Sequence, residues 1–295
     1  MIDPRIVQRA PRKGNHLTLL LCGEPGTGKH TFLNTLAHAS AISNVDGSST
    51  GGAAEDGSDC LGGHFQDICV RDPNFPPVSI NAIVCTVGQE IDNTGVAEKI
   101  VKYLENQFSK ILEEEIRIKR NPKYVDTRVH VALYFIRATG KGLNELDIKC
   151  MQKIGTRCNL IPIISKADTL TRDELIENKN LIQRDLERAN VRVFSFTSAD
   201  EDEDEEDEQG QFLQGMIPFA VMTSEETKVG KNSDEILHYR EFPWGEIIIE
   251  EVETNEFNVL KAVLLSTYVE ELRDRTNHDI YEQYRTEKLQ SKAVN

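Results

Sequence analysis

The chain has 295 residues, of which 39% are hydrophobic and 28% are charged, and its formal net charge is −15. This composition is typical of a globular protein with a sizeable core, and the negative charge argues against nucleic acid as the main partner. The longest apolar runs, residues 17–22 and 131–136, are far short of the roughly 20 residues that cross a bilayer, and the first residues lack the apolar stretch of a secretory signal.

Short apolar runs and amphipathic helical patterns alternate along most of the chain. The runs predict strands at residues 17–22, 78–84, 128–136, 159–165 and 191–196. The helical patterns predict helices at residues 29–38, 96–115, 143–154 and 172–189. Short strands between amphipathic helices are typical of an open, mainly parallel sheet with helices on both faces, so we expect a three-layer α/β domain.

Several segments depart from this alternation. Residues 43–63 are rich in Gly, Ser and Asp and predict a loop, and the nine consecutive carboxylates of residues 200–208 predict an extended, solvated loop. Residues 242–250 predict a strand and a turn, and a long helix is expected from about residue 256. No change in composition separates a second domain.

A phosphate-binding loop is predicted between the first strand and the first helix, where the sequence reads GEPGTGKH. The pattern G-x-x-x-x-G-K binds phosphate because glycines let backbone N–H groups wrap it, the following helix adds positive potential, and the lysine reaches the outer phosphates. The sequence therefore predicts a nucleotide site that contains Gly23, Gly26, Thr27, Gly28 and Lys29.

Both positions that normally hold magnesium in such a site carry unsuitable residues. The pattern usually ends in a hydroxyl that ligates Mg²⁺, but His30 stands here, and the next residue, Thr31, points about 100° away on a helix. The second ligand is usually the carboxylate of a D-x-x-G motif; here Cys85 takes its place, while Gly88 keeps the glycine. A zinc site made by His30 and Cys85 lacks further soft ligands nearby. We therefore expect no bound metal, and very slow or absent hydrolysis.

A base-reading motif and its neighbours resemble one family of GTP-binding proteins. In Ser165-Lys166-Ala167-Asp168 the carboxylate can accept from the ring N–H and amino group of guanine, and the lysine stem can cover the base. This tetrapeptide resembles the AKAD of septins. Further segments that resemble septin motifs are Tyr134-Phe135-Ile136, Gly140-Lys141-Gly142-Leu143, Leu146-Asp147, residues 161–164, Ile217-Pro218-Phe219, Arg240, Phe242-Pro243-Trp244-Gly245, Asn255-Glu256-Phe257 and residues 281–285. The chain is identified as a member of the septin family over residues 17–289.

The resemblance implies a P-loop NTPase domain of the Ras-like kind, followed by a C-terminal element of strands and helices that is specific to septins. We expect a short basic segment at residues 1–15, the GTPase-type domain at residues 16–289 with the specific element at about 225–289, and a tail at residues 290–295. Septins form filaments through two faces, one over the nucleotide site and one built from the terminal helices. The family's C-terminal coiled coil is not seen.

The resemblance also implies roles for two residues of the septin-specific element. Trp244 is expected to be the aromatic anchor of the nucleotide-side face, and Arg240 is expected to pack on guanine. The alternatives are a core position for Trp244, and a surface ion pair of Arg240 with Glu241 or Glu246.

Other positions depart from the septin pattern. Lys141 replaces a histidine that contacts phosphate from the partner's side, and Thr223 replaces a glycine beside guanine. The first switch region offers only Ser48, Ser49 and Thr50 as candidates for the threonine that supports hydrolysis. These departures resemble the divergent, hydrolysis-deficient septins of fungal complexes, including end subunits and sporulation-specific forms.

The expected function is that of a septin subunit with little or no catalysis. It would assemble with other septins into hetero-oligomers and filaments that act as a cytoskeletal scaffold in septum formation, cytokinesis or sporulation. No cofactor is expected; GTP or GDP is the candidate ligand, and Mg²⁺ is disfavoured. The alternative is a slow GTPase that uses shifted ligands such as Thr31, whereas a small-molecule kinase does not fit the FPWG segment or the final helix.

The cysteines and the basic N-terminus bear on location. Six scattered cysteines indicate free thiols in a reducing compartment, so we expect a cytoplasmic protein in filaments or rings at the cell cortex, division site or bud neck. Arg5, Arg9, Arg12 and Lys13 resemble the basic segment with which septins touch anionic lipids, and a solvated terminus is an equal alternative.

Overall fold

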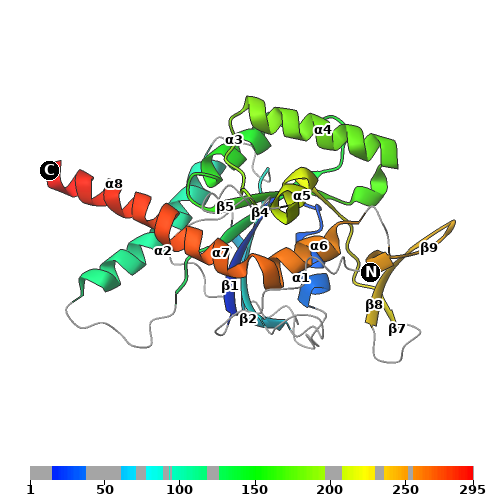
Figure 1. Ribbon diagram of the computed structural model, residues 1–295, viewed down its shortest axis with the longest axis horizontal. Coiled ribbons are helices and arrows are strands. Elements are labelled where there is room, and N and C mark those ends of the chain that lie inside the picture. Colours follow the sequence, from blue (N-terminus) through cyan, green and yellow to red (C-terminus); the bar gives the residue numbers. More distant parts are fainter. Residues whose placement is uncertain are drawn as a thin grey trace.

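The computed structural model describes residues 15–37, 61–70, 78–88, 93, 95–117, 126–196, 208–229, 236–251 and 255–294. Among these residues, six strands form one sheet, and helices cover both of its faces (Figure 1). The strands are β1 (Asn15–Gly23), β2 (Leu61–Val70), β3 (Val78–Cys85), β4 (Val131–Arg137), β5 (Asn159–Ser165) and β6 (Phe219–Val221). The helices are α1 (Lys29–Ala37), α2 (Val96–Ile116), α3 (Glu145–Ile154), α4 (Arg172–Arg188), α5 (Glu208–Met216), α6 (Phe257–Ala262), α7 (Val269–Asp274) and α8 (Tyr281–Val294).

The strand order places β1 in the middle of the sheet. The order is β2-β3-β1-β4-β5-β6, and every neighbouring pair is parallel except β2 and β3. Leu21 of β1 pairs with Val84 of β3 on one side and with Leu133 of β4 on the other. The mainly parallel, three-layer α/β architecture expected from the sequence is confirmed. The loops that follow β1, β3, β4 and β5 meet at one edge of the sheet, where ligands bind in folds of this kind.

Alternate side chains of β1 build the two halves of the core. Leu19 and Leu21 are fully buried in the half that also contains side chains of α1, α5, α6 and α7. Leu20 and Cys22 are fully buried in the other half, with side chains of α2, α3 and α4. Burial of a leucine side chain contributes about 1.5–3 kcal/mol, so both faces of this strand hold the sheet between its helices.

Two parts of the sheet differ from the sequence expectation. The predicted strand at residues 191–196 is wrong: the edge of β5 is taken by β6, whose residues pair with residues 163–165. Phe194 still donates its N–H to the carbonyl of Leu160 at 2.8 Å, but the N–H of Phe196 is bound by the Gln214 side chain at 3.1 Å. Residues 61–63, expected in a loop, belong to β2.

Two further elements were not foreseen. Glu208, the last residue of the acidic run, begins helix α5 instead of ending an extended loop. After β6, the chain forms a small antiparallel sheet of β7 (Thr227–Val229), β8 (Ile236–Phe242) and β9 (Gly245–Ile248). The turn between β8 and β9 agrees with the strand and turn expected at residues 242–250. The small sheet lies beside the main sheet on the right of Figure 1, and α8 ends on the opposite side.

The expected long C-terminal helix is interrupted by two π-helical turns, η4 (Val263–Thr267) and η5 (Arg275–Ile280). At η5 the side chain of Asn159 enters the helix: its Nδ2 lies 2.9 Å from the carbonyl of Leu272 and 3.1 Å from the hydroxyl of Thr276. The same Nδ2 also donates to the carbonyl of His130 at 2.8 Å. A side chain that enters the helical hydrogen-bond ladder widens a turn, so β5 fixes the course of the last helices.

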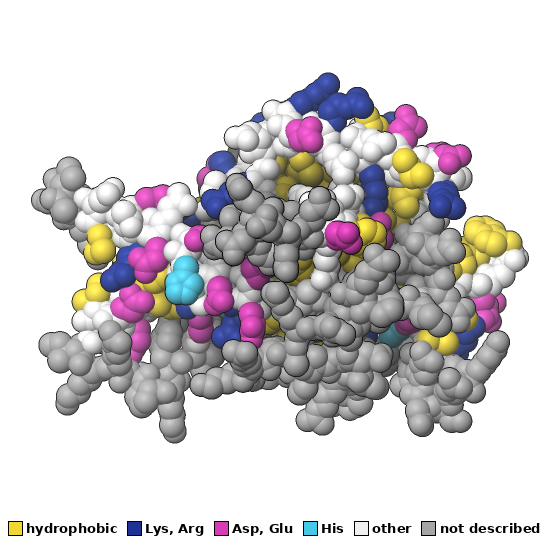
Figure 2. Space-filling model, in the orientation of Figure 1, with side chains coloured by type: hydrophobic (Ala, Val, Ile, Leu, Met, Phe, Trp, Pro, Cys, Tyr) yellow, Lys and Arg dark blue, Asp and Glu magenta, His cyan; other side chains and the backbone are white. Residues whose placement is uncertain are grey.

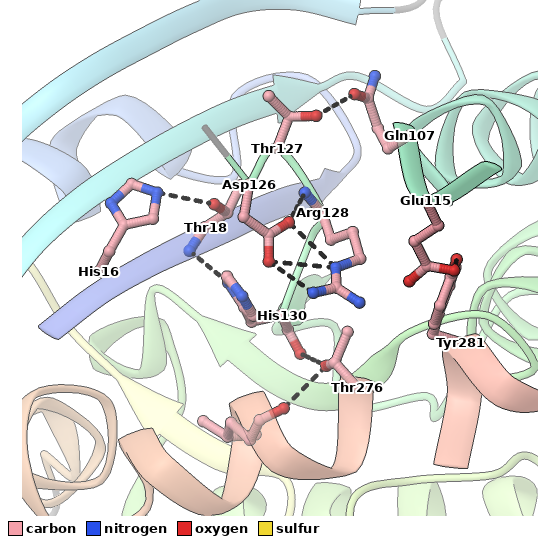
Figure 3. A network of polar contacts seen from close by, with 11 residues as sticks. His16, Thr18, Gln107, Glu115, Asp126, Thr127, Arg128, His130, Thr276 and Tyr281 are labelled. Carbon is pink, nitrogen blue, oxygen red and sulfur yellow. Dashed lines mark hydrogen bonds and ion pairs between the residues drawn. The ribbon is translucent and has the colours of Figure 1, made fainter. Parts of the chain in front are cut away.

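A polar network closes the end of the sheet away from the phosphate loop (Figure 3). His130 is buried, and its Nδ1 accepts the backbone N–H of Thr18 at 2.9 Å. Its carbonyl accepts from the hydroxyl of Thr276 at 3.3 Å. Burial lowers the pKa of His130 to about 4, although the nearby Asp126 opposes the shift. Arg128 binds Asp126 at 2.7 Å and lies 5.1 Å from the ring centre of Tyr281, which joins the network to α8.

We predict that His130 makes the protein less stable in mild acid. Its folded-state pKa lies below the usual 6.5, so between pH 6.5 and 4 the unfolded chain binds a proton that the folded chain does not. The free energy of unfolding should therefore fall on acidification, by about 2 kcal/mol from pH 7 to 5 on account of this group. His130→Asn keeps an acceptor for Thr18 and removes the titration. Urea unfolding at both pH values should show a pH difference smaller by about 2 kcal/mol in the variant.

The matched control is His278→Asn, which removes an exposed histidine from η5. An equal loss of stability on acidification in the wild type and in His130→Asn would show that this histidine does not carry the effect.

Candidate nucleotide-binding site

The loop between β1 and α1 has the glycine geometry of a phosphate cradle. Gly26 and Gly28 have positive φ angles of 74° and 82°, a region that favours glycine. Gly23 has φ of 144°, and a Cβ at this position would lie 2.4 Å from the carbonyl oxygen of Phe135 on β4. The close approach of β4 therefore requires glycine at residue 23. The positive φ angles of the turn favour glycine at residues 26 and 28.

The Lys29 ammonium is bound by the loop itself. It is buried and donates to the carbonyls of Gly23 at 2.9 Å and Glu24 at 2.6 Å, and to the hydroxyl of Thr27 at 3.3 Å. An ammonium group has three N–H donors, so these contacts match its full capacity. Burial lowers the pKa of Lys29, while the nearby thiols of Cys22 and Cys85 oppose this shift.

The loop is also tied to the neighbouring strand and helix through Glu24. Arg137, at the end of β4, lies 2.9 Å from one carboxylate oxygen of Glu24 and donates to the carbonyl of Pro25 at 3.2 Å. Asn144, which precedes α3, donates to the other oxygen of Glu24 at 3.3 Å. These bonds hold the loop in the conformation in which Lys29 binds its own backbone.

Neither position expected to hold magnesium supplies an oxygen. The imidazole of His30 is exposed on the wall of the cleft, whereas the thiol of Cys85 is fully buried at the end of β3. The hydroxyl of Thr31 faces the cleft but donates to Glu225 at 3.3 Å, as Asn34 does at 3.1 Å. Mg²⁺ prefers oxygen ligands, so this donor set does not fit it. Among the described residues, no group of three or more His, Cys, Asp or Glu is arranged to hold a metal ion.

A cleft of about 820 Å³ opens above the phosphate loop. Of the residues predicted for the site, those that line it are Gly26, Thr27, Gly28, Lys29, Lys166 and Arg240. The charges along its wall are mixed, because the carboxylates of Glu225, Glu226 and Glu241 lie in the same wall as the cations of Lys29, Lys166 and Arg240. Thr223, expected beside the base, also lines it.

Asp168, expected to read guanine, does not line the large cleft and forms an ion pair with Arg240. The Arg240 Nη1 atom is 2.9 Å from Asp168 Oδ2. Arg240 therefore forms its ion pair with Asp168, not with Glu241 or Glu246. Glu246 instead binds Lys228 at 2.6 Å. Asp168 lines a second, smaller cavity of about 190 Å³.

The remaining predicted residues lie outside the cleft. Gly88 has a positive φ of 86° but is not part of the cleft wall. Lys141 is exposed on the loop before α3, and its backbone N–H contacts the hydroxyl of Thr139. Trp244 is 78% exposed at the tip of the β8–β9 turn, so the alternative of a core tryptophan is wrong. Its ring stacks on that of Phe242, with centroids 5.0 Å apart.

Some predictions fall outside the described residues. These are the first-switch candidates Ser48, Ser49 and Thr50, and the basic residues Arg5, Arg9, Arg12 and Lys13.

Two contributors to the site were not predicted from the sequence. Glu225 follows β6, and its position over the cleft is fixed by α1, where Thr35 donates to the carbonyl of Ser224 at 3.0 Å. Arg137 is the last residue of β4. Both come at the carboxyl end of a parallel strand, which is the signal that could have identified them.

The chain is similar to known proteins over nearly its whole length. A family model described as Septin matches residues 13–295. Cell division control protein 11 of Saccharomyces cerevisiae is 35% identical over 287 residues, which cover 96% of this chain and 68% of that protein. Septin homolog spn3 of Schizosaccharomyces pombe is 34% identical over 294 residues, 98% of this chain and 77% of that protein. The crystal structure of Cdc11 from Saccharomyces cerevisiae aligns with a TM-score of 0.57 and 28% identity, covering 92% of this chain and 99% of that one.

We predict that Gly23→Ala destabilises the protein much more than Gly26→Ala does. Both glycines have positive φ, so each substitution should cost about 1 kcal/mol in backbone strain. At Gly23 the added Cβ also meets backbone 2.4 Å away, whereas nothing lies within 4 Å at Gly26. The total cost at Gly23 should therefore reach about 3 kcal/mol or more. Urea unfolding of both variants measures this, and equal losses would contradict the close packing of the loop on β4.

Proposed function

The chain belongs to the septin family, and from this premise we propose that it is a structural septin subunit whose nucleotide site serves assembly rather than GTP hydrolysis. It would join other septins in hetero-oligomers and filaments that act as a scaffold in septum formation, cytokinesis or sporulation. The relative named cell division control protein 11 supports a role in division.

The proposal depends chiefly on the state of the phosphate loop. Magnesium supplies much of the charge stabilisation in phosphoryl transfer, and the two positions that would hold it carry the imidazole of His30 and the buried thiol of Cys85. The ammonium that would reach the outer phosphates is bound by the carbonyls of Gly23 and Glu24. A nucleotide would have to break these bonds without a metal ion to offset its phosphate charge.

The mixed charge of the cleft wall also supports weak nucleotide binding. Its wall carries three carboxylates beside the three cations of Lys29, Lys166 and Arg240. Glu225 is held at the mouth by Thr31 and Asn34, both on α1 directly behind the phosphate loop. A carboxylate near the phosphates repels them, so the cleft favours a nucleotide less than a uniformly basic site does.

We predict that the purified protein carries far less than one nucleotide per chain. The protein would be denatured, and the released nucleotide separated and quantified by chromatography. Stoichiometric GDP or GTP would refute the proposal.

The alternative is a slow GTPase, which finds support in the hydroxyl of Thr31 on the cleft wall. In that case single-turnover assays would show hydrolysis that depends on magnesium and is abolished by Lys29→Ala. Hydrolysis that is absent, or unchanged by Lys29→Ala, would count against an enzyme.

Two surfaces of the protein would bind neighbouring septins in the filament. One surrounds the nucleotide cleft and includes the β8–β9 turn, where Figure 2 shows hydrophobic side chains at the surface. The other would be formed by the terminal helices, including α8, which extends away from the sheet in Figure 1.

No helix among the described residues is long and apolar enough to cross a membrane. Filaments or rings in the cytoplasm, at the cortex, division site or bud neck, are the proposed location, with membrane contact through the basic N-terminal residues.

We predict that Trp244→Ala weakens association across the nucleotide-side face. A tryptophan that is 78% exposed in the single chain offers a large apolar surface to a partner. Its loss should weaken pairing by roughly 30-fold, equivalent to about 2 kcal/mol. Sedimentation equilibrium of the chain with a septin partner gives the association constant.

The matched control is Phe212→Ala, which removes another exposed aromatic ring, on α5. An association constant that stays the same in Trp244→Ala would count against the assigned face.

A further inference from the structure

The outer edge of β6 is bound by two consecutive residues that precede α6. Glu256 donates its backbone N–H to the carbonyl of Ala220 at 2.9 Å, and its carboxylate accepts the Ala220 N–H at 2.6 Å. Asn255 binds Met222, just after the strand, with its side-chain amide alone. Its Oδ1 accepts the Met222 N–H at 3.0 Å, and its Nδ2 donates to the Met222 carbonyl at 3.1 Å. Side chains thus satisfy backbone groups that an edge strand would otherwise expose.

The Asn255 amide binds three segments of the chain at once. Besides its bonds to Met222, its Nδ2 donates to the carbonyl of Ile249 at 3.0 Å, and its Oδ1 accepts the N–H of Phe257 at 3.2 Å. Met222 follows β6, Ile249 follows β9, and Phe257 begins α6. An amide side chain has two N–H donors and an oxygen with two lone pairs, so these four bonds use its whole capacity.

Burial makes this junction between the three segments costly to break. Asn255 is only 9% exposed, and a buried backbone group that loses its hydrogen-bond partner is destabilising. A rotated amide would set its NH₂ group against two N–H groups and its oxygen against two carbonyls. One orientation of the side chain therefore satisfies all four partners, so the amide fixes the direction as well as the distance between the segments.

The β8–β9 hairpin extends away from the main sheet (Figure 1) and is joined to the rest of the protein by polar contacts. At its root, beside the Asn255 bond, Asn258 Nδ2 donates to the carbonyl of Glu250 at 3.1 Å. On β8, Arg240 pairs with Asp168 at 2.9 Å. The Asn255 amide binds the root of the hairpin and the end of β6 with one group, so it sets the position of one relative to the other.

We propose that Asn255 is a positioning residue for assembly, whose amide fixes the β8–β9 hairpin, and with it Trp244, relative to the main sheet. Trp244 directly precedes β9 and Ile249 directly follows it. The Asn255 bond therefore holds the far end of the strand that begins beside the exposed tryptophan. The inference rests on the proposed function, since it takes Trp244 as the contact with a partner across the nucleotide-side face.

A fixed hairpin strengthens association because a partner does not have to order it. The Trp244 ring is 78% exposed and stacks on Phe242 of the same hairpin, so its position follows that of the hairpin. Ordering a mobile segment on binding costs free energy that is lost from the affinity. Without the Asn255 bonds, this cost would fall on each pairing event across the nucleotide-side face.

Because Trp244 is the sole tryptophan of the chain, its motion can be measured without a partner. Time-resolved fluorescence anisotropy of the full chain separates local motion of the tryptophan from tumbling of the whole protein. Asn255→Ala removes all four bonds and should increase the amplitude of the nanosecond local motion about twofold. Asn255→Asp keeps both acceptor contacts but sets a carboxylate against the carbonyls of Met222 and Ile249. It should give a similar increase, and it serves if the alanine variant does not fold.

The matched control is Asn159→Ala, which removes another buried asparagine with several hydrogen bonds. Asn159 binds the carbonyls of His130 and Leu272, at the end of the sheet away from the phosphate loop. Its loss should lower the stability to urea and leave the motion of Trp244 unchanged. An unchanged amplitude in both Asn255 variants would overturn the proposal, and so would an equal increase in Asn159→Ala.

The consequence for assembly is tested by a double-mutant cycle with Trp244→Ala, measured by sedimentation equilibrium with a septin partner. Asn255→Ala should weaken association roughly tenfold in the parent chain. In the Trp244→Ala chain the loss should be less than about twofold, because Asn255 acts through the tryptophan. Where Trp244→Ala does weaken pairing, equal losses in both backgrounds, or no loss in the parent chain, would overturn the role in assembly. No effect of Trp244→Ala itself would refute the proposed nucleotide-side face alone, and Asn255 would then be judged by the anisotropy.

Discussion

The parallel pairing of β1 with β3 and β4 is the constraint on which the site depends. It brings the ends of three strands to one edge, so that Gly23 lies against Phe135 and the thiol of Cys85 lies near the Lys29 ammonium. It also places Arg137 where it can bind Glu24 of the phosphate loop. The strands are held in this register by side chains buried on both faces, and burial of this extent leaves little freedom to move one loop without its neighbours.

In the site at this edge of the sheet, charged side chains are bound by other groups of the protein. The Lys29 ammonium is bound by the loop's carbonyls, and Asp168 is bound by Arg240. Each contact satisfies a buried or partly buried charge that would otherwise be costly.

The main features of the fold could be predicted from the sequence because they depend on local patterns. The strand 159–165, the helix 96–115 and the loop before Lys29 are set by hydrophobic period and by glycine spacing. The segment 191–196 has the same local pattern as a strand but loses the β5 edge to β6, a competition between segments far apart in the chain. The π-helical turn at residues 275–280 likewise receives a hydrogen bond from Asn159, which lies more than a hundred residues away in the chain.

For the site, the sequence by itself determined the residue types: a phosphate-loop lysine, a histidine and a cysteine in place of oxygen ligands, and an aspartate that can read a base. Those identities decide which metal or base the site could hold, because ligand chemistry belongs to the side chain. Only the tertiary structure decided the partners, namely Lys29 with its own loop, Thr31 with Glu225, and Asp168 with Arg240. The reason is that a hydrogen bond depends on distance and direction between atoms, and in the last two pairs the partners lie on segments far apart in the sequence.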